Sequence, residues 1–267
     1  MLNKNIQNQI IAELKVKPVI EPAEEVGRRI DFLCNFLKTS GLRGLVLGIS
    51  GGQDSTLAGK LAQAAVKKAG GTFIAMKLPY GTQVDADDVE LALDFIKPDE
   101  VIHFDIKPTV DALCSTYALA AGTILTDYHK GNVKARIRMT VQYAVAGQRN
   151  MAVIGTDHAS ENLTRFFTKF GDGAADILPL FGLTKFQGRA MLRAFPGYPE
   201  KICTKSPTPD LLDGIPARPD EEELGITYQA IEDFLTGKDI DDKTFNRIYE
   251  LYNKGGHKAR PPITLYD

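Results

Sequence analysis

A glycine-rich run at residues 48–55, Gly-Ile-Ser-Gly-Gly-Gln-Asp-Ser, carries the residue types that bind phosphate. Gly48, Gly51 and Gly52 permit positive φ and close approach of the backbone, so successive N–H groups can converge on an anion. Two serines add hydroxyls, and a predicted helix begins directly afterwards, whose N-terminus has partial positive charge. The run therefore predicts a site for nucleotide phosphates.

Asp54 indicates which kind of phosphate site this is. The run lacks the final Gly-Lys-Ser/Thr of a Walker A loop and the spacing of the dinucleotide fingerprint. A carboxylate inside a phosphate loop repels the ligand unless a cation lies between them, so we interpret Asp54 as a ligand of Mg²⁺. The alternative is a glycine-rich turn without a ligand, but six specified positions between a predicted strand and a predicted helix favour the functional interpretation.

A second group of polar residues follows a later predicted strand. Thr156 and Glu161 come directly after the apolar residues 151–155. If both strands belong to one parallel sheet, their carboxyl ends meet at the same edge, where ligands collect. We therefore expect Glu161 to join Asp54 at one Mg²⁺. Taken alone, Glu161 would be a solvated carboxylate in the first turn of a helix.

Two further segments contain charges with more than one interpretation. Arg136 lies in a basic stretch that is typical of a solvated helix face, although its planar guanidinium also suits a substrate phosphate. Lys169 and Asp176 lie in a glycine-rich turn, where side chains more often serve function than packing. The neighbouring phenylalanines of residues 166–170 are interpreted as core.

The apolar pattern predicts an α/β fold with an open, mainly parallel sheet and helices on both faces, Rossmann-like in its arrangement. Helical and extended patterns alternate, as expected for βαβ units. Helices are expected at 5–14, 21–37, 55–69, 85–95, 109–120, 132–146 and 184–195, and strands at 45–47, 72–78, 101–105 and 151–155.

We expect a single domain over residues 1–267. Its parts are N-terminal helices at 1–40, a nucleotide-binding core at 43–200, a mobile loop at 205–224, and C-terminal helices and a tail at 225–267. The loop contains four prolines and six acidic residues with little periodicity. A stretch of this length is either disordered or an active-site lid, and we favour the lid.

Composition excludes several classes of protein. The chain has 267 residues, 43% of them apolar, and a net charge of -2, without the overall basic charge of nucleic-acid binders. Three cysteines and four histidines are scattered, which argues against disulfides and zinc and suits a reducing compartment. No apolar run is long enough to span a membrane. We expect a cytoplasmic protein that binds neither nucleic acid nor membrane.

Beyond single motifs, the chain resembles the ammonia-dependent NAD⁺ synthetases, members of the N-type ATP pyrophosphatases, which have the adenine nucleotide alpha hydrolase-like fold. Matching segments run collinearly at 47–63, 77–88, 130–139, 153–162, 166–180, 183–189, 206–213, 220–228 and 257–263. The resemblance implies ATP-dependent amidation of deamido-NAD⁺ with ammonia, through an adenylated intermediate, with release of AMP and pyrophosphate. It also implies a homodimer and, since no amidase domain precedes the first motif, free ammonia as the nitrogen donor.

The resemblance further assigns site residues. It implies Asp54 and Glu161 as ligands of Mg²⁺, and Asp54, Lys185 and Asp176 as catalytic, with Asp176 the candidate for binding or deprotonating ammonium. It implies as ATP ligands Gly48, Ile49, Ser50, Gly51, Gly52, Gln53, Asp54, Ser55, Thr156, Lys185 and Thr208. It implies as ligands of deamido-NAD⁺ Arg136, Lys169, Asp176, His257 and Lys258.

Two alternatives remain open at this point. Another N-type ATP pyrophosphatase would use the same loop to adenylate a different acceptor, such as a tRNA base or an amino acid. A nonenzymatic adenine-nucleotide sensor would have no need of Asp54 and Glu161 together. Turnover with deamido-NAD⁺ and ammonium separates these possibilities from the synthetase.

Overall fold

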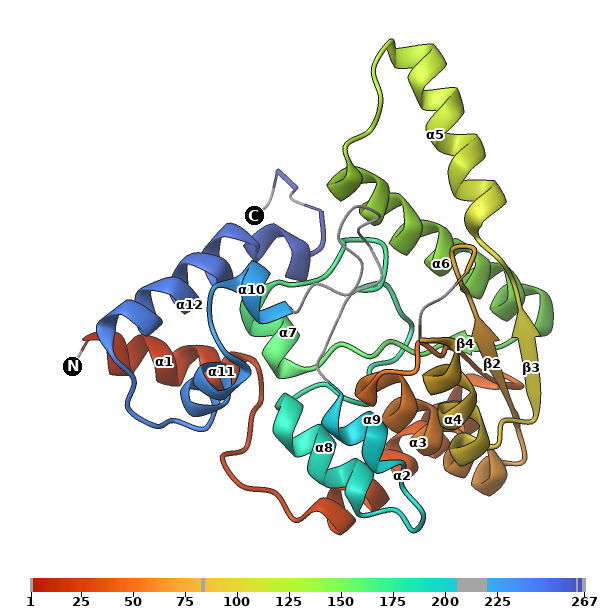
Figure 1. Cartoon of the computed structure of the whole chain (residues 1–267). Helices are drawn as coiled ribbons and strands as arrows, with labels where there is room; N and C mark the ends of the chain where they lie inside the picture. Colours follow the sequence, from red (N-terminus) through yellow and green to blue (C-terminus); the bar gives the residue numbers. More distant parts are fainter. Residues whose placement is uncertain (1, 83–84, 206–219, 263, 266–267) are drawn as a thin grey trace.

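A parallel sheet forms the centre of the computed structural model, which describes residues 2–82, 85–205, 220–262 and 264–265 (Figure 1). Within these residues the sheet has four strands in the order β3-β2-β1-β4, and all pairs are parallel. The strands are β1 (Gly44–Gly48), β2 (Thr72–Lys77), β3 (Glu100–His103) and β4 (Ala152–Val153). The predicted α/β fold with a parallel sheet is confirmed.

Both faces of the sheet are buried, as expected when crossover helices cover each side. Leu45 and Leu47 of β1 point into a core with one set of helices, whereas Val46 points into a second core on the opposite face. The first set consists of α2 (Pro22–Ser40), α3 (Gln53–Ala69), α4 (Ala86–Ile96), α8 (Lys185–Arg193) and α9 (Glu200–Thr204). The second set consists of α5 (Lys107–Ala121) and α6 (Asp127–Arg149).

A further helical layer lies beside the carboxyl edge of the sheet and brings the two ends of the chain together (Figure 1). Its core contains Ile10, Leu163, Phe234 and Ile248, all buried. The layer comprises α1 (Leu2–Glu13), α7 (Ala159–Thr164), α10 (Asp220–Leu224), α11 (Tyr228–Leu235), α12 (Asp242–Lys254) and the 3-10 helix η1 (Gly256–Ala259). Among the described residues, no helix combines the length and the apolar character needed to cross a membrane.

The strand order creates a crevice between β1 and β4. After β1 the chain moves outward through β2 and β3, and it then returns to place β4 on the other side of β1. Connections leaving the carboxyl ends of β1 and β4 therefore diverge, and this reversal is the usual ligand site of an open α/β sheet. The glycine-rich run follows β1, and Thr156 follows β4, so both lie at this reversal.

Several predicted boundaries need correction. β4 ends at Val153: the N–H of Ile154 still donates to the carbonyl of Val46 in β1, but Gly155 donates to the carbonyl of Ile177 in a loop. α6 begins at residue 127, earlier than predicted, since the Thr126 hydroxyl accepts from the backbone N–H of His129 and caps the helix.

The predicted loop at 205–224 is helical at its end, where α10 places four acidic residues at a helix N-terminus. Residues 206–219, with Thr208, lie outside the described residues.

Candidate functional site

The turn after β1 is shaped by its glycines and serines. Gly51 has φ +75°, and a Cβ there would lie 2.8 Å from the backbone carbon of Asp88, so only glycine fits without strain. The Ser50 amide donates to the Ser55 hydroxyl at 3.2 Å, and the two serine hydroxyls are 3.1 Å apart. These contacts fold the turn over the N-terminus of α3, as the predicted phosphate site requires.

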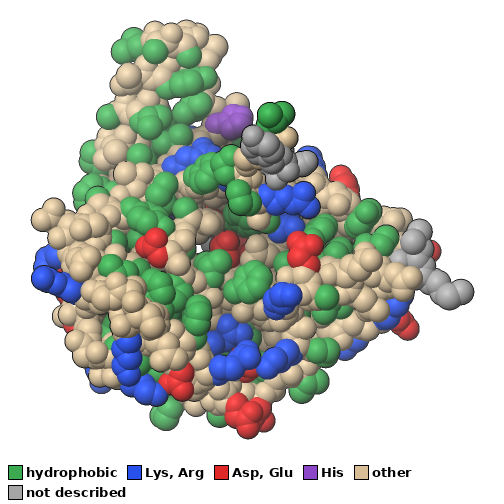
Figure 2. Space-filling view, turned by 180° about the vertical axis from the view of Figure 1, so that it is seen from behind, with side chains coloured by type: hydrophobic (Ala, Val, Ile, Leu, Met, Phe, Trp, Pro, Cys, Tyr) green, Lys and Arg blue, Asp and Glu red, His purple; other side chains and the backbone are tan. Residues whose placement is uncertain are grey.

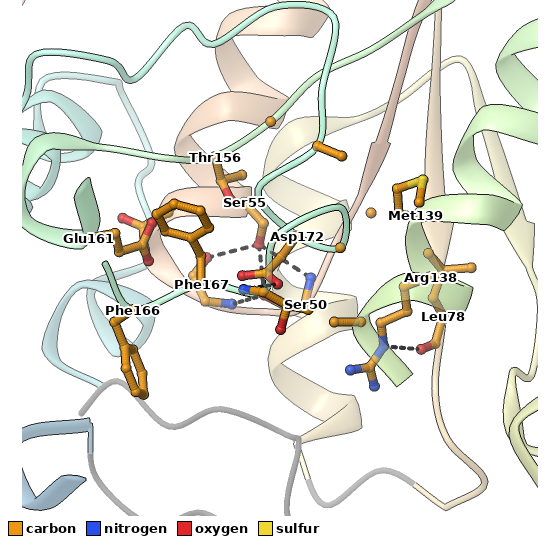
Figure 3. Close-up of a pocket in the computed structure, with 18 of the residues that line it drawn as sticks. Ser50, Ser55, Leu78, Arg138, Met139, Thr156, Glu161, Phe166, Phe167 and Asp172 are labelled. Carbon is orange, nitrogen blue, oxygen red and sulfur yellow. Dashed lines mark hydrogen bonds between the residues drawn. The ribbon is translucent and has the colours of Figure 1, made fainter. Parts of the chain in front are cut away.

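A cavity of about 420 Å³ lies above this turn. Its size is typical of sites for small molecules. Figure 3 shows Ser50, Ser55 and Thr156 among the residues that line it, together with Glu161, Phe167 and Asp172. The wall on the opposite side comes from β2 and α6, where Arg138 donates to the carbonyl of Leu78 at 3.0 Å. The cavity thus adjoins the turn predicted to bind phosphate.

Asp54 and Lys185 form an ion pair at the edge of the cavity. The ammonium of Lys185 lies 2.5 Å from Asp54 Oδ2, and the two side chains are 8% and 16% exposed. Burial disfavours the Asp54 carboxylate, but Lys185 and then His158 outweigh it and hold the pKa of Asp54 below its usual range. Burial likewise lowers the pKa of Lys185, yet the carboxylates of Asp54 and Glu161 raise it overall. Both groups are therefore charged at neutral pH.

The side chain of Gln53, predicted as an ATP ligand, makes hydrogen bonds to α8. Its amide nitrogen donates to the carbonyl of Lys185 at 2.9 Å, and Arg189 donates to its side-chain oxygen at 3.3 Å. The side chain therefore joins the start of α3 to α8. Since the Ser160 hydroxyl accepts from the Lys185 amide at 3.1 Å, Lys185 is held from two sides.

His158 contacts the carboxylates of both Asp54 and Glu161. His158 Nε2 lies 3.6 Å from Asp54 Oδ1 and 3.6 Å from Glu161 Oε1, and one ligand atom from each residue falls within 4.8 Å of the others. Burial raises the pKa of Glu161 to about 8, and the Asp54 carboxylate adds to this effect. Burial also opposes protonation of His158, but Glu161 and Asp54 outweigh it and raise its pKa.

The residues present fit a divalent cation. Two carboxylates, whose oxygens are the ligands that Mg²⁺ prefers, converge in a largely enclosed place. A cation between the carboxylates would offset the burial, and the smaller repulsion from Asp54, that raise the pKa of Glu161. The geometry thus agrees with the predicted pairing of Asp54 with Glu161.

The predicted dinucleotide ligands form a second group, mostly outside the residues that line the cavity. Arg136 donates to the carbonyl of Lys169 at 3.3 Å, and the Lys169 ammonium donates to the carbonyl of His257 at 2.7 Å. Lys258, which does line the cavity, donates to the carbonyls of Arg165 and Phe167 at 3.0 and 2.8 Å. The structure therefore brings these four predicted residues together beside the cavity mouth.

The carboxylate of Asp176 accepts hydrogen bonds from within the protein. It accepts the backbone N–H of Val153 at 2.7 Å and the Tyr143 hydroxyl at 3.3 Å, and it is not among the cavity lining. Asp172, four residues earlier, does line the cavity. The backbone turns just after Asp172, where the N–H of Ala174 donates to the carbonyl of Gly171 at 3.1 Å.

Sequence reasoning assigned no role to His158 or Asp172, although both lie in segments that resemble the synthetases, at 153–162 and 166–180. His158 lacked any metal-binding spacing along the chain. A usable signal was the run of polar residues 156–161 immediately after a predicted strand. The core interpretation of the phenylalanines was wrong for Phe170, which is 57% exposed, and Phe167 lines the cavity.

The two ends of the predicted lid also lie at the cavity. Lys205 lines it and pairs with Asp85 and Asp88, each at 2.8 Å. Asp220 lines it as well and accepts the Tyr228 hydroxyl at 2.8 Å. The segment between them lies outside the described residues.

Comparisons with known proteins agree with the geometry. A family model described as NAD synthase matches residues 25–262. An NH(3)-dependent NAD(+) synthetase from Bacillus licheniformis is 52% identical over 267 residues, covering 98% of each chain. One from Bacillus subtilis is 52% identical over 268 residues with the same coverage.

Two solved structures are similar over almost their full lengths. An NAD⁺ synthetase from Burkholderia pseudomallei superposes with a TM-score of 0.83 at 46% identity, covering 97% of this chain and 98% of that one. An NMN synthetase from Francisella tularensis gives a TM-score of 0.81 at 35% identity, covering 92% of this chain and 99% of that one.

Asp157 makes the stability depend on pH. Burial raises its pKa to about 7, with repulsion from Asp172 adding to the shift. In the unfolded chain it ionises near its ordinary value, so its contribution to stability is complete below about pH 4 and is lost as pH rises to about 7. We expect the free energy of unfolding of Asp157→Asn, relative to the wild type, to rise over this range by on the order of 2–4 kcal/mol and to stay level above it.

Urea titrations in EDTA between pH 4 and pH 8 measure this difference. The control is Asp94→Asn, which removes an exposed carboxylate from α4 and should change the free energy of unfolding by less than about 0.5 kcal/mol throughout. A constant difference between Asp157→Asn and the wild type at every pH would show that Asp157 ionises normally in the folded protein.

Proposed function

The chain belongs to the NAD synthase family, and on this premise we infer that it is an enzyme that amidates deamido-NAD⁺ with ammonia at the expense of ATP. It is a ligase that forms a C–N bond, and the reaction passes through an adenylated intermediate and releases AMP and pyrophosphate. One observation carries this inference: the phosphate turn, Asp54, Glu161 and Lys185 converge on a single cavity at the strand-order reversal.

The first step is attack of the nicotinate carboxylate on the α-phosphate of ATP. Both reactants are anions, so charge must be neutralised before they can approach. The backbone amides of the turn and the N-terminus of α3 face the β- and γ-phosphates that depart as pyrophosphate. Lys185, held by Asp54 and by the backbone contact to Ser160, places a fixed ammonium beside them.

The proposed cofactor is Mg²⁺, held by Asp54 and Glu161. When bound, it neutralises charge on the phosphate oxygens and on the departing pyrophosphate. Ionisation of Glu161 then accompanies binding, since the pKa of about 8 reflects the site without a cation. ATP binding extends to Thr156, which lines the cavity, and, by resemblance alone, to Thr208.

The second step is attack of ammonia on the activated carbonyl, with AMP as the leaving group. Adenylation is needed because hydroxide is a poor leaving group from a carboxylate. Ammonium must lose a proton before it can attack, so a carboxylate beside the cavity is required to attract the cation and accept that proton. We assign this role to Asp172, which lines the cavity while its Oδ1 accepts the backbone N–H of Thr168 at 3.0 Å, and not to Asp176, which is not among the lining residues.

The remaining predicted ligands bind deamido-NAD⁺ in this proposal. Arg136, Lys169, His257 and Lys258 form a continuous group beside the mouth of the cavity. Their position lets the nicotinate end reach the α-phosphate while the rest of the dinucleotide stays outside. Asp176, on the surface near Tyr143, remains a candidate ligand of the same substrate.

We also propose that the enzyme is a homodimer that contacts its copy through α5 and the start of α6. This segment projects from the body of the protein, and Figure 2 shows hydrophobic side chains along it. Leu119 and Ile124 are 89% and 84% exposed, and Tyr128 is 57% exposed. Apolar side chains that project together into water mark a contact surface. The free thiols of Cys34, Cys114 and Cys203 suit the proposed cytoplasmic location.

Turnover tests the function directly. The purified chain, given ATP, Mg²⁺, deamido-NAD⁺ and ammonium, should produce NAD⁺, AMP and pyrophosphate in equal amounts. Asp54→Ala should lower pyrophosphate release at least about 100-fold, because it removes a cation ligand and leaves Lys185 without its partner. Asp94→Ala, an exposed change, should leave it unaffected.

The acceptor must be varied in the same assay. The Francisella relative is an NMN synthetase, so the corresponding mononucleotide serves as the competing substrate. We expect preference for deamido-NAD⁺, since the cation group outside the cavity can bind the second nucleotide. A folded sample without turnover on deamido-NAD⁺ would refute the proposal, and preference for the mononucleotide would reassign the substrate.

Substitutions can distinguish whether Asp172 or Asp176 binds and deprotonates ammonium. Asp172→Asn should lower kcat/KM for ammonium by about 100-fold or more, because it removes both the attraction and the proton acceptor. ATP–pyrophosphate exchange in the presence of deamido-NAD⁺ should persist, since adenylation precedes ammonia. Asp176→Asn is the matched control and should keep the ammonium dependence of the wild type; the reverse pattern would transfer the role to Asp176.

The dimer is tested by its apolar surface. Leu119→Glu together with Ile124→Glu should convert the protein to a monomer in analytical ultracentrifugation, because the charges would be buried at the contact. Val19→Glu changes a side chain that is 83% exposed elsewhere on the surface and should not alter the mass. A monomeric wild type, or a double variant that stays dimeric, would contradict this assignment.

A further inference from the structure

His158 is a buried side chain that the proposed mechanism does not use. Only 2% of it is exposed, and Nε2 faces the carboxylates of Asp54 and Glu161. We propose that His158 is a positioning residue that holds these two carboxylates through an Nε2–H donor and is not itself a ligand of the cation. This inference rests on the divalent site of the proposed function and adds a specific role for a third residue.

The position of the proton on His158 follows from its place in the fold. His158 is the N-cap of α7, and its Nδ1 accepts the backbone N–H of Glu161 at 3.4 Å. A nitrogen that accepts a hydrogen bond carries no hydrogen, so a neutral imidazole with this cap has its hydrogen on Nε2. The helix cap thereby directs an N–H donor at the two carboxylates.

Ligation by His158 would require the opposite tautomer. For Nε2 to offer a lone pair to a cation, the hydrogen must move to Nδ1, where it would oppose the amide hydrogen of Glu161. An imidazolium meets the same obstacle, because it too carries a hydrogen on Nδ1. The neutral form with its hydrogen on Nε2 satisfies both the helix cap and the carboxylates.

The surrounding contacts suit a positioning role. Asp54 Oδ2 is already paired with Lys185, so Oδ1 is the oxygen left facing His158 at 3.6 Å. Glu161 Oε1 lies at the same distance on the other side of Nε2. Both distances exceed a hydrogen bond, and a small closure of either carboxylate onto Nε2 would complete one. A ligating carboxylate that also accepts a hydrogen bond is fixed in orientation, which strengthens metal binding.

Two substitutions separate the functions of the two ring nitrogens. Asparagine carries a side-chain oxygen near the position of Nδ1, so His158→Asn retains the helix cap but does not reach the carboxylates. Glutamine carries an amide nitrogen near the position of Nε2, so His158→Gln retains the donor but loses the short capping group. The two variants form a matched pair at one position.

The probe is Mn²⁺ with α,β-methylene-ATP, which resists cleavage between the α and β phosphates. We measure Mn²⁺ affinity by electron paramagnetic resonance and record electron spin echo envelope modulation with unlabelled and ¹⁵N-histidine protein. The wild type should show no coupling from a directly bound imidazole nitrogen. His158→Asn should bind Mn²⁺ about 10–100-fold more weakly, while His158→Gln should stay within about threefold of the wild type.

The outcomes are distinct. A histidine nitrogen coupled directly to Mn²⁺ would make His158 a ligand and overturn the proposal, and so would wild-type affinity in His158→Asn. Weak binding by both variants, with equally lowered melting temperatures, would reduce His158 to a structural residue. If the wild type bound no Mn²⁺, the divalent site of the proposed function would fail, and this role with it. The spectrum of the wild type decides on ligation even if a variant does not fold.

Discussion

The ion pair between Asp54 and Lys185 is the contact on which the site depends. It joins the helix that follows β1 to the start of α8, two segments far apart in the chain. A buried pair contributes little if it is poorly supported, because desolvation opposes it. Here Gln53 and Ser160 fix the backbone of Lys185 from two directions, so the ammonium is held in place before any substrate arrives. The same pair fixes the Asp54 oxygen that faces His158.

This arrangement explains why Lys185 is buried whereas Arg136 and Lys169 lie on the surface. Lys185 is buried and paired, which suits a charge that must lie at a defined point beside the phosphates. Arg136 and Lys169 lie on the surface and donate to backbone carbonyls, which suits the recognition of a larger substrate at the mouth. In the proposed function, a rigid centre for the reaction is thus separate from a more open surface for the dinucleotide.

Sequence alone predicted the parts of the fold that depend on local pattern. The alternation of apolar runs gave the parallel sheet, and the glycine-rich run located the turn after β1, because both signals lie within short stretches. The role of His158 could not be predicted, since its neighbours Asp54 and Glu161 meet only when β1 and β4 lie side by side. Nor could the sequence show that Asp172 and not Asp176 lines the cavity, because each carboxylate accepts hydrogen bonds from partners that only the fold brings near, Thr168 for Asp172 and Val153 with Tyr143 for Asp176.

α6 connects the proposed subunit contact with the phosphate turn. It is 23 residues long, which corresponds to about 35 Å of continuous helix. Tyr128 near its start belongs to the proposed subunit contact, and Gln142 near its end accepts the backbone N–H of Gly48 at 2.7 Å, directly before the phosphate turn. A helix of this length moves as one body, so a displacement at the subunit contact would reach the turn without any rearrangement between them. Communication between the two active sites of a dimer, and hence cooperativity in ATP binding, would have a mechanical route through this helix.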